Sequence, residues 1–357
     1  MLLVCVVLSL QFLFAALDDV HAPLLSIELF RQRPEWKVRL ITDVRLSPFG
    51  TLVSYFNSSS GVKHIWVVKL DEGPGAEPVQ VTFYKEGVPK YFWTYLPDLL
   101  AFYYDPFQKG TDLLYLLNLE DIRRPAVHET SRMPTHGPKH EVFYPSIHTS
   151  YERPDTVAML QARAGGVVDL YSMNMIKREF NKLLALNIGS YKMVLDNQLN
   201  VRLAETFATS RLPADLYKVK VLKNGTALFK RIKSQIQDTL WVQPFEVSHF
   251  DKNNTGFYWI GYNGADTRSL YWSSFDRPDQ HKLLFSPKSG IRPKLFEASA
   301  VVFHPVMHTP LVGLDAYGIP KLVALNESVK SDVEKINNIE PFGEPNVHGV
   351  SVGMYFL

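Results

Sequence analysis

The residues best suited to covalent catalysis stand near the C-terminal end of the chain, in the stretch HGVSVG at 348–353. Its Gly-x-Ser-x-Gly pattern would make Ser351 a nucleophile if the serine followed a buried strand, opened a helix and preceded an Asp and a His. The preceding residues EPFGEPN favour turns, and only four residues follow Gly353. We therefore interpret the match at Ser351 as fortuitous and predict no catalytic residue.

Two pairs of histidines have a spacing compatible with a metal site. His136 and His140 stand in HGPKH, and His304 and His308 stand in HPVMH. Zinc needs a third ligand nearby and a rigid element, and the prolines in both stretches disfavour a continuous helical face. The stretch DKNNTG at 251–256 resembles the start of a calcium loop, but a tyrosine stands where a bidentate glutamate is needed. We expect loop or strand-end histidines, a hairpin turn at 251–256, and neither a metal nor another cofactor.

The elements that would position any such residue repeat along the chain. Six short aromatic or aliphatic strands recur at steps of 49, 56, 46, 54 and 52 residues. A period near fifty, with one strand of the same kind in each unit, is typical of propeller blades. We therefore predict an all-β chain folded as a β-propeller of six to eight blades, each of about 50 residues. The strands are HIWVVKL centred on Trp66, DLLYLLNL on Tyr115, DLYSMNM on Tyr171, DLYKVKV on Tyr217, SLYWSSF on Tyr271 and IPKLVAL on Val323.

Hairpin patterns fill the space between these strands. Apolar residues alternate around a Pro-Phe-Gly turn in 43–55, around a Pro-Asp turn in 91–104, around an Asn-rich turn in 249–263, and again in 300–318. Each hairpin precedes one of the recurring strands. Three to four antiparallel strands per unit is the arrangement expected of a blade.

One helix is predicted, from Glu327 to Ile339, after the last recurring strand. Ser331 and Glu334 would form a capping box at its start. Three apolar residues fall on one face at helical spacing: Val329, Val333 and Ile336. We therefore expect a short helical segment near the C-terminus, where the propeller ends.

The first 22 residues have the composition of a secretory signal. The segment from 2 to 17 is almost wholly apolar but short for a membrane span, and small residues end the stretch Val20-His21-Ala22. A signal anchor is the alternative. We predict a protein that is secreted or lumenal in the secretory pathway, with a signal peptide at 1–22, a propeller at 24–326, and a helical segment and tail at 327–357.

Two further features agree with secretory routing. The one cysteine, Cys5, lies inside the predicted signal, so the mature chain would have neither a disulfide nor a thiol nucleophile. Four Asn-x-Ser/Thr sequons make the protein a candidate glycoprotein. The candidate sites are Asn57, Asn224, Asn253 and Asn326.

The charge balance limits the class of partner. The chain has 38 basic and 36 acidic residues and a formal net charge of +2, which disfavours a nucleic-acid partner. The densest basic stretch, from Lys218 to Lys233, carries six positive charges. A patch for acidic glycans is one interpretation, and the favoured one is the solvated face of edge strands, which lysines commonly protect.

Several motifs resemble the N-terminal propeller of the prolyl-oligopeptidase-like serine peptidases, the group with dipeptidyl- and acylaminoacyl-peptidases. LLSIELF followed by LSPFGTLVSYF is similar to that group's first hairpin, with Phe49 where Asp is usual. HIWVVKL, FWTYLPDLLAFYYD and VVDLYSMNM are similar to later strands, and VALNESVKSDVEKINNI to a helical segment after the last blade. The resemblance covers about residues 24 to 340. It implies a propeller that restricts peptide entry to a separate serine hydrolase domain.

We therefore predict the non-catalytic, substrate-gating propeller of a secreted prolyl-oligopeptidase-like serine peptidase, with the catalytic domain missing through truncation or in an inactive relative. The group's Gly-x-Ser-Tyr-Gly-Gly pattern is not matched at Val352 or Met354. The alternative is a stand-alone secreted propeller that binds a peptide, a glycan or a protein partner. Neither interpretation requires a membrane span in the mature chain.

Overall fold

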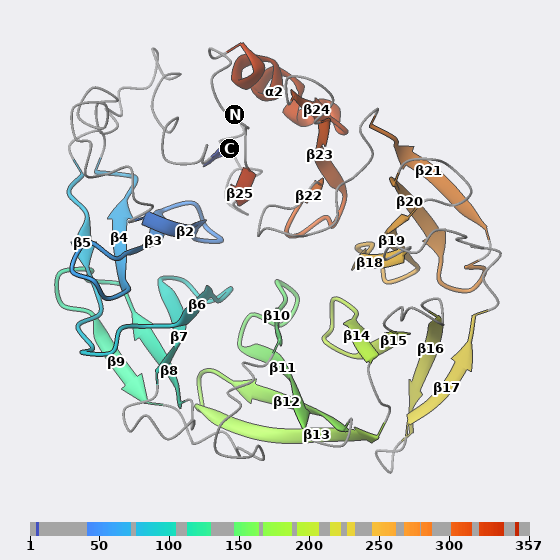
Figure 1. Ribbon diagram of the computed structural model, residues 1–357, viewed down its shortest axis with the longest axis horizontal. Coiled ribbons are helices and arrows are strands. Elements are labelled where there is room, and N and C mark those ends of the chain that lie inside the picture. Colours follow the sequence, from blue (N-terminus) through green and yellow to red (C-terminus); the bar gives the residue numbers. More distant parts are fainter. Residues whose placement is uncertain are drawn as a thin grey trace.

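Six antiparallel sheets follow one another along the chain and stand around a central axis as the blades of a propeller (Figure 1). The prediction of an all-β propeller is confirmed, with six blades. The computed structural model describes residues 5–6, 41–72, 76–104, 113–129, 146–163, 167–187, 191–206, 215–222, 227–232, 245–261, 268–278, 280–287, 301–315, 321–338 and 347–349.

Strands pair in chain order within each blade, so every blade is one stretch of sequence. Blade 1 contains β2 (Ile41–Leu46), β3 (Leu52–Asn57), β4 (His64–Lys69) and β5 (Val79–Gln80). Blade 2 contains β6 (Lys90–Trp93), β7 (Leu99–Tyr104), β8 (Leu113–Asn118) and β9 (Ala126–Glu129). Blade 3 contains β10 (Ser146–Thr149), β11 (Thr156–Arg163), β12 (Val167–Asn174) and β13 (Glu179–Asn187).

The second half of the ring follows the same plan. Blade 4 contains β14 (Tyr191–Leu195), β15 (Val201–Thr206), β16 (Leu216–Val221) and β17 (Ala227–Arg231). Blade 5 contains β18 (Phe245–Phe250), β19 (Gly256–Gly261), β20 (Ser269–Ser274) and β21 (His281–Phe285). Blade 6 contains β22 (Val301–Phe303), β23 (Pro310–Asp315) and β24 (Lys321–Ala324). The first strand of each blade lies nearest the centre (Figure 1).

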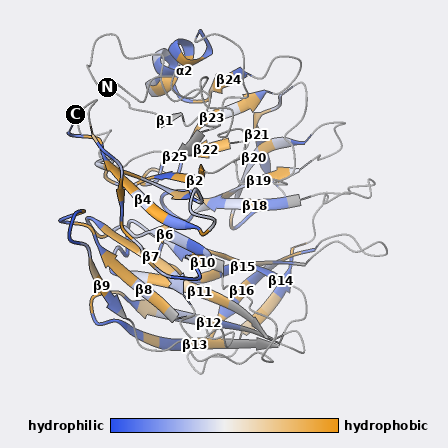
Figure 2. Cartoon of the chain, turned by 60° about the vertical axis from the view of Figure 1, so that its left-hand side comes forward, coloured by the Kyte–Doolittle hydropathy of each residue, from blue (hydrophilic) through white to orange (hydrophobic). Residues whose placement is uncertain are grey.

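The hydrophobic core is divided among the seams, which are the packed spaces between neighbouring blades. Along β19 every residue is buried because the two faces of the strand serve two different seams. Phe257 and Trp259 pack toward blade 4, whereas Tyr258 and Ile260 pack toward blade 6. Hydrophobic clusters of this kind fill the 1–2, 2–3, 3–4, 4–5 and 5–6 seams. Figure 2 shows the resulting mixture of hydrophobic and hydrophilic residues along the strands.

The inner turn, which joins the two innermost strands of a blade, is built alike in all six blades. A side-chain acceptor at its first residue receives a hydrogen bond from a backbone N–H two to five residues later, which fixes the turn locally. The predicted hairpins at 43–55, 91–104, 249–263 and 300–318 are confirmed. The acceptors are Ser47, Thr94, Ser150, Asp196, Asp251 and His304.

The Asp-Leu-Tyr strands also share a local device. In β12 the buried Asp169 accepts a hydrogen bond from the hydroxyl of Tyr171 at 3.3 Å, and Lys182 of β13 lies 3.0 Å from the same carboxylate. In blade 4 the hydroxyl of Tyr217 donates to Asp215 at 3.4 Å, and Arg231 of β17 lies 2.6 Å from that carboxylate. In both blades a cation therefore fastens the outermost strand to the third.

A short helical segment covers the outer edge of blade 6. It consists of a 3-10 turn, η3 (Glu327–Val329), and the helix α2 (Lys330–Asn337). The side chain of Asn337 accepts the N–H of Leu322 at 3.0 Å and donates to its carbonyl at 2.8 Å, as a neighbouring strand would. The apolar face is confirmed, since Val329 and Val333 are buried against the blade. The helix therefore takes the place of a fourth strand.

The predicted capping box at Ser331 and Glu334 is wrong. The segment begins at Glu327, as the pattern predicted, but its cap is Asn326, which accepts the N–H of Ser328 at 3.0 Å. The helix then continues from Val329 without a side-chain cap of its own. A cap further along would have no free helix end to serve.

The ring closes differently between blade 6 and blade 1. Among the described residues, no hydrophobic cluster joins blade 6 or α2 to blade 1. Instead, β25 (Val347–Gly349) lies beside β2 and pairs antiparallel with β1 (Cys5–Val6). The described parts of the two ends of the chain therefore meet at this position (Figure 1).

Candidate functional site

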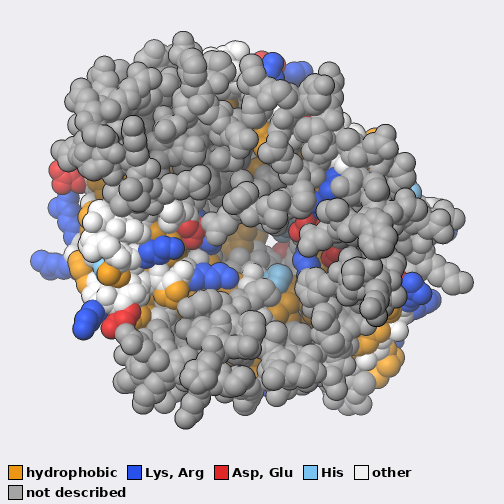
Figure 3. All heavy atoms as spheres, viewed as in Figure 1, with side chains coloured by type: hydrophobic (Ala, Val, Ile, Leu, Met, Phe, Trp, Pro, Cys, Tyr) orange, Lys and Arg blue, Asp and Glu red, His pale blue; other side chains and the backbone are white. Residues whose placement is uncertain are grey.

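The ring surrounds a central opening, and acidic, basic and histidine side chains gather at its rim (Figure 3). Charged residues of blades 4 and 5 approach one another beside the innermost strands β14 and β18. We name this group the inner charge cluster. Its members are Lys192, Glu205, Glu246 and Arg268.

Two residues of blade 4 hold the free inner edge of blade 5. Lys192 on β14 and Glu205 on β15 are directly opposite each other in the strand pairing. The Nζ of Lys192 donates to the carbonyl of Val247 at 3.2 Å, and the N–H of Val247 points to Oε2 of Glu205 at 3.4 Å. Because β18 is innermost, these groups of Val247 have no further strand to pair with. The two side chains supply partners for both.

The other two members, Glu246 and Arg268, belong to blade 5, and Glu246 connects Lys192 of blade 4 to Arg268. Oε1 of Glu246 lies 3.4 Å from Nζ of Lys192, and its Oε2 lies 3.7 Å from the guanidinium of Arg268. The Arg268 side chain is only 3% exposed, and its Nε has no hydrogen-bond partner among the described residues. The cluster therefore retains a buried donor that an additional acceptor would satisfy.

The setting shifts two titratable groups. Burial raises the pKa of Glu205 to about 7, although Lys192 and the N–H of Val247 favour its charged form. Burial and the nearby Lys192 lower the pKa of His148, on β10 of blade 3, to about 4. The wall therefore combines the side chains of Lys192, Arg268 and Glu246 with the carboxyl group of Glu205, which is only partly ionised near neutral pH. This arrangement favours polar groups of a peptide over an apolar ligand.

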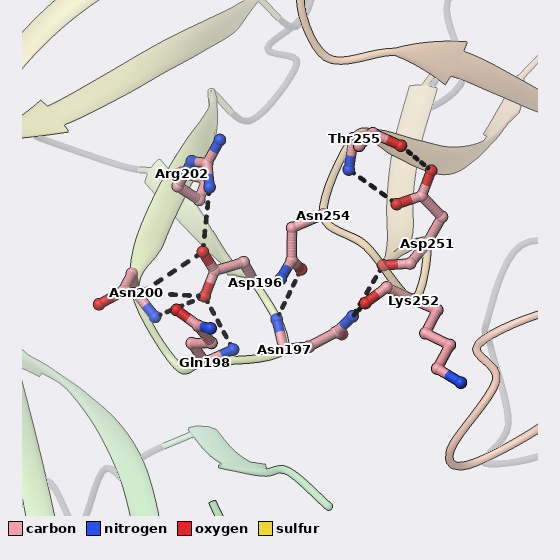
Figure 4. Close-up of polar contacts among 9 residues, drawn as sticks. All are labelled: Asp196, Asn197, Gln198, Asn200, Arg202, Asp251, Lys252, Asn254 and Thr255. Carbon is pink, nitrogen blue, oxygen red and sulfur yellow. Dashed lines mark hydrogen bonds and ion pairs between the residues drawn. The ribbon is translucent and has the colours of Figure 1, made fainter. Parts of the chain in front are cut away.

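The inner turns of blades 4 and 5 are linked by hydrogen bonds centred on Asn197 (Figure 4), and a further bond joins this residue to the inner turn of blade 3. Its Nδ2 donates to the carbonyls of Asp251 at 2.7 Å and Lys252 at 3.3 Å, and its N–H donates to Oδ1 of Asn254 at 3.0 Å. Its carbonyl accepts from the hydroxyl of Ser150. One residue thus contacts three blades, which favours a structural role for this network.

Asp196 organises the turn that carries Asn197. Its side chain is 2% exposed, its Oδ1 accepts the N–H groups of Gln198 and Asn200, and its Oδ2 lies 3.1 Å from Arg202 (Figure 4). The turn bends back at Leu199, whose φ of 63° is left-handed, an uncommon conformation for a leucine. A buried, fully partnered carboxylate of this kind holds a loop rather than a ligand.

The histidine pair in HPVMH belongs to the inner turn of blade 6. Nδ1 of His304 accepts the N–H groups of Val306 and Met307, at 3.0 and 3.1 Å. Burial lowers the pKa values of both His304 and His308 to about 4, and the nearby Lys252 adds to each shift. His304 therefore acts as a turn cap, and among the described residues no group of three or more potential ligands is arranged to hold a metal.

The remaining predicted site residues divide into two groups. Asn57 ends β3, Asn253 lies exposed in the inner turn of blade 5, and Asn326 caps the 3-10 turn. The stretch at 251–256 forms that inner turn, with Asp251 accepting the N–H of Thr255 at 2.8 Å. Four candidates lie outside the described residues: Ser351, His136, His140 and Asn224.

Sequence reasoning missed the inner charge cluster. Its members stand as far as 76 positions apart, from Lys192 to Arg268, and each is an ordinary charged residue in its own strand. One signal was present, since Lys192 and Glu205 sit at strand positions where an apolar residue would complete the alternation. Recognising it requires knowing which strands lie innermost.

The sequence was compared with protein-family models and with known proteins, and a similar protein was found among the latter. No protein-family model matches the chain. The chain is 24% identical over 291 residues to "Dipeptidyl peptidase family member 6" of Caenorhabditis elegans. The predicted resemblance to the dipeptidyl-peptidase group is confirmed. The match covers 77% of this chain and 36% of the relative, so the chain spans about a third of the length of the protein it matches.

Three solved structures align with most of this chain, each with a TM-score below 0.5. Porphyromonas gingivalis dipeptidyl peptidase 4 covers 84% of this chain with a TM-score of 0.45 at 12% identity, over 45% of its own length. Pyrococcus horikoshii acylaminoacyl peptidase covers 83% with a TM-score of 0.45 at 12% identity, over 46% of its length. The β-propeller domain of the Trilobed protease from Pyrococcus furiosus covers 81% with a TM-score of 0.44 at 12% identity, over 84% of its length.

The described residues were also compared with the requirements of a membrane span. None of the helices among them is long and apolar enough to cross a bilayer. The helix α2 has only 8 residues.

Proposed function

We propose that this chain is the substrate-gating propeller of a prolyl-oligopeptidase-like serine peptidase. The observation that carries the proposal is the six-bladed ring in a chain related over most of its length to dipeptidyl peptidase family member 6. A ring of blades around a central opening that charged side chains line would admit an extended peptide more readily than a folded protein. The inner charge cluster would contact a peptide on its way through.

Peptide binding at the channel wall tests this role. Fluorescence anisotropy with a labelled tetrapeptide should show weak binding to the 357-residue chain, and Glu205→Gln with Lys192→Met should reduce it. Lys330→Met is the matched control, because among the described residues Lys330 pairs only with the exposed Glu327 on the outer helical segment. Equal binding by the cluster variant and the control would contradict a gating role for this wall.

We further propose that the chain does not hydrolyse peptides by itself. The blades and α2 account for nearly all described residues, and the inner charge cluster contains no serine, threonine or cysteine. In the related group the chemistry is expected from a separate hydrolase domain. Incubation of the purified chain with a fluorophosphonate probe should give no covalent adduct, and labelling at Ser351 would overturn the proposal.

Secretion and glycosylation are part of the same proposal. The apolar segment within 1–22 supports a signal peptide, and two sequons have a geometry open to modification. Asn57 and Asn326 use Oδ1 to accept the N–H two residues later, at 2.8 and 3.0 Å, and neither Nδ2 has a partner among the described residues. Expression in secretory cells should give a medium form whose mass falls on endoglycosidase treatment.

A stand-alone binding module is the second candidate. The observation that favours it is β25, which returns to lie beside the first blade at β2. A self-sufficient ring should protect this strand, whereas a detached domain should leave it accessible. Limited proteolysis of the segment from 326 to 357 distinguishes the two, and the transcript downstream of Leu357 supplies an independent answer.

A further inference from the structure

The outer hairpin of blade 4, formed by β16 and β17, has two faces of different character. On one face Asp215, Tyr217 and Arg231 bind one another, and Phe229 packs toward blade 3. On the other face Lys218 stands directly opposite Lys230, and Lys220 lies two residues further along. Leu216 and Ile232 of this face are buried in the 4–5 seam, and its exposed part carries the three lysines with Leu228 opposite Lys220. We call this exposed part the outer basic face.

An aromatic ring collects cations beside this face. Phe275, which follows β20 of blade 5, lies 4.3 Å from the guanidinium of Arg202 and 4.6 Å from Nζ of Lys218, measured to the ring centroid. Nζ of Lys218 also reaches the carbonyl of Asp276 at 3.4 Å. Two cations are thus held in place at the edge of the 4–5 seam, and less side-chain entropy is lost when a ligand binds them.

Nearby carboxylates offset only part of the positive charge of the face: Asp196 pairs with Arg202, and Asp276 lies near Lys218. Lys220 and Lys230 form no ion pair or side-chain hydrogen bond among the described residues and are exposed. Like charges directly opposite each other on a sheet are destabilising. Burial lowers the pKa of Lys218, and Lys230 adds to the shift while Asp276 opposes it. The repulsion between these cations lowers the stability of the fold, and an anion bound to the face would reduce that repulsion.

We propose that the outer basic face, formed by Lys218, Lys220 and Lys230 with Arg202 beside Phe275, binds a sulfated oligosaccharide. This site is separate from the inner charge cluster, so it adds a surface attachment to the proposed gating role. The residue types suit the ligand, because a lysine ammonium is a compact charge that pairs well with isolated sulfate groups.

The dimensions also favour a narrow linear polyanion. Opposed lysines lie about 5 Å apart and alternate residues on one strand about 7 Å apart, so the face offers a short track of charge. The chain as a whole has a formal net charge of +2, which gives little long-range attraction to nucleic acid or to a broad anionic membrane. A sulfated glycan can bind through the short row of lysines on this face alone. The basic stretch is therefore more than a solvated strand face.

Calorimetric titration of the 357-residue chain with a heparin octasaccharide tests the proposal. We expect binding that weakens as salt rises, and Lys218→Gln with Lys230→Gln should weaken it about tenfold. Arg231→Gln is the matched control, since Arg231 is adjacent to Lys230 but points to the other face and pairs with Asp215. Its affinity for the octasaccharide should equal that of the unchanged protein.

Several results would overturn the proposal. Equal binding of a desulfated octasaccharide, or unchanged affinity in the double variant, would show that the lysines of this face do not bind sulfate groups. Tighter binding to a DNA duplex or to phosphatidylserine vesicles would assign the face to another class of partner. If the double variant did not fold, Lys220→Gln would give the answer, because Lys220 is exposed and contacts no described side chain through a hydrogen bond or ion pair.

Discussion

The 4–5 seam and the junction between blade 6 and blade 1 close the same ring by different means. The 4–5 seam combines a hydrophobic cluster, two side chains bound to Val247, and the Asn197 network between inner turns. At the 6–1 junction the described residues provide α2 along one edge and the short β25 beside β2. In repeat proteins each unit is stabilised by its neighbours, so the junction at which the described residues share no hydrophobic cluster should open first.

Trp259→Ala is expected to have the largest effect among the variants that test this difference between the 4–5 seam and the 6–1 junction. The side chain is 1% exposed, stacks on Tyr271 at 4.4 Å and donates to Ser273 at 2.8 Å. We expect a loss of about 3–5 kcal/mol in the free energy of unfolding. Val333→Ala, in α2, should cost about 2 kcal/mol and leave the 4–5 seam intact. Urea unfolding followed by circular dichroism measures both, and equal losses would mean that the two regions are equally important.

The pH dependence of Glu205 comes next in size. Its pKa rises from 4.5 to about 7 on folding, so the unfolded state loses its proton first and stability falls as pH rises from 4.5 to 7. The expected loss is about 3 kcal/mol. Glu205→Gln should abolish this pH-dependent loss of stability. The histidines contribute equally to both proteins, so their opposite effect cancels when the stability of the variant is subtracted from that of the unchanged protein at each pH. Thermal melts from pH 4 to 8 provide the measurement, and a difference that is constant with pH would refute the shift.

Those histidines act in the reverse direction. His148, His304 and His308 have pKa values lowered to about 4, so the unfolded state binds protons first and stability rises with pH between 4 and 6.5. His304→Gln should flatten this rise while keeping an acceptor for the turn. A steeper loss of stability in acid than in the unchanged protein would contradict the assignment.

Asn197→Ala tests the polar part of the 4–5 seam. Removing Nδ2 leaves the carbonyls of Asp251 and Lys252 without this donor, and we expect a cost of about 2 kcal/mol. Gln198→Ala is the control, because Gln198 is exposed and only its backbone joins the turn. Hydrogen exchange should show faster opening of the inner turns of blades 4 and 5 in Asn197→Ala alone.

The smallest effect is expected at the edge of blade 6. Asn337→Ala removes both hydrogen bonds to Leu322 and should cost about 1 kcal/mol, mostly as local release of α2. Proteolysis near Lys335 should accelerate with little change in the global midpoint. A large drop in that midpoint would show that α2 supports the whole ring.

The fold was predictable because it depends on short-range patterns. Recurring strands such as the one at Tyr171, and turns such as the one at Asp98, are encoded within a few residues. The helical segment was predictable from Val329 and Val333, but its cap was not. Asn326 competes with Ser331 for that role, and only the 3-10 turn decides between them.

The candidate site was not predictable for a different reason. Glu205 is unusual only because Lys192 and the backbone of Val247 meet it from two blades. Such a meeting depends on which strand of each blade faces the centre, and alternation along a strand does not contain that information. The outer basic face was visible as a basic stretch, but its separation from Arg231 required the strand register.

The six inner turns have a consequence for the history of the chain. Their first residues are Ser, Thr, Ser, Asp, Asp and His, yet each performs the same task with whatever acceptor it carries. A blade copied from its neighbour can therefore exchange one acceptor for another without losing its shape. The sequences of duplicated blades can then diverge while the propeller fold is kept. A common origin of the blades would therefore be easier to recognise from the hydrogen-bonding role of a position than from the residue type found there.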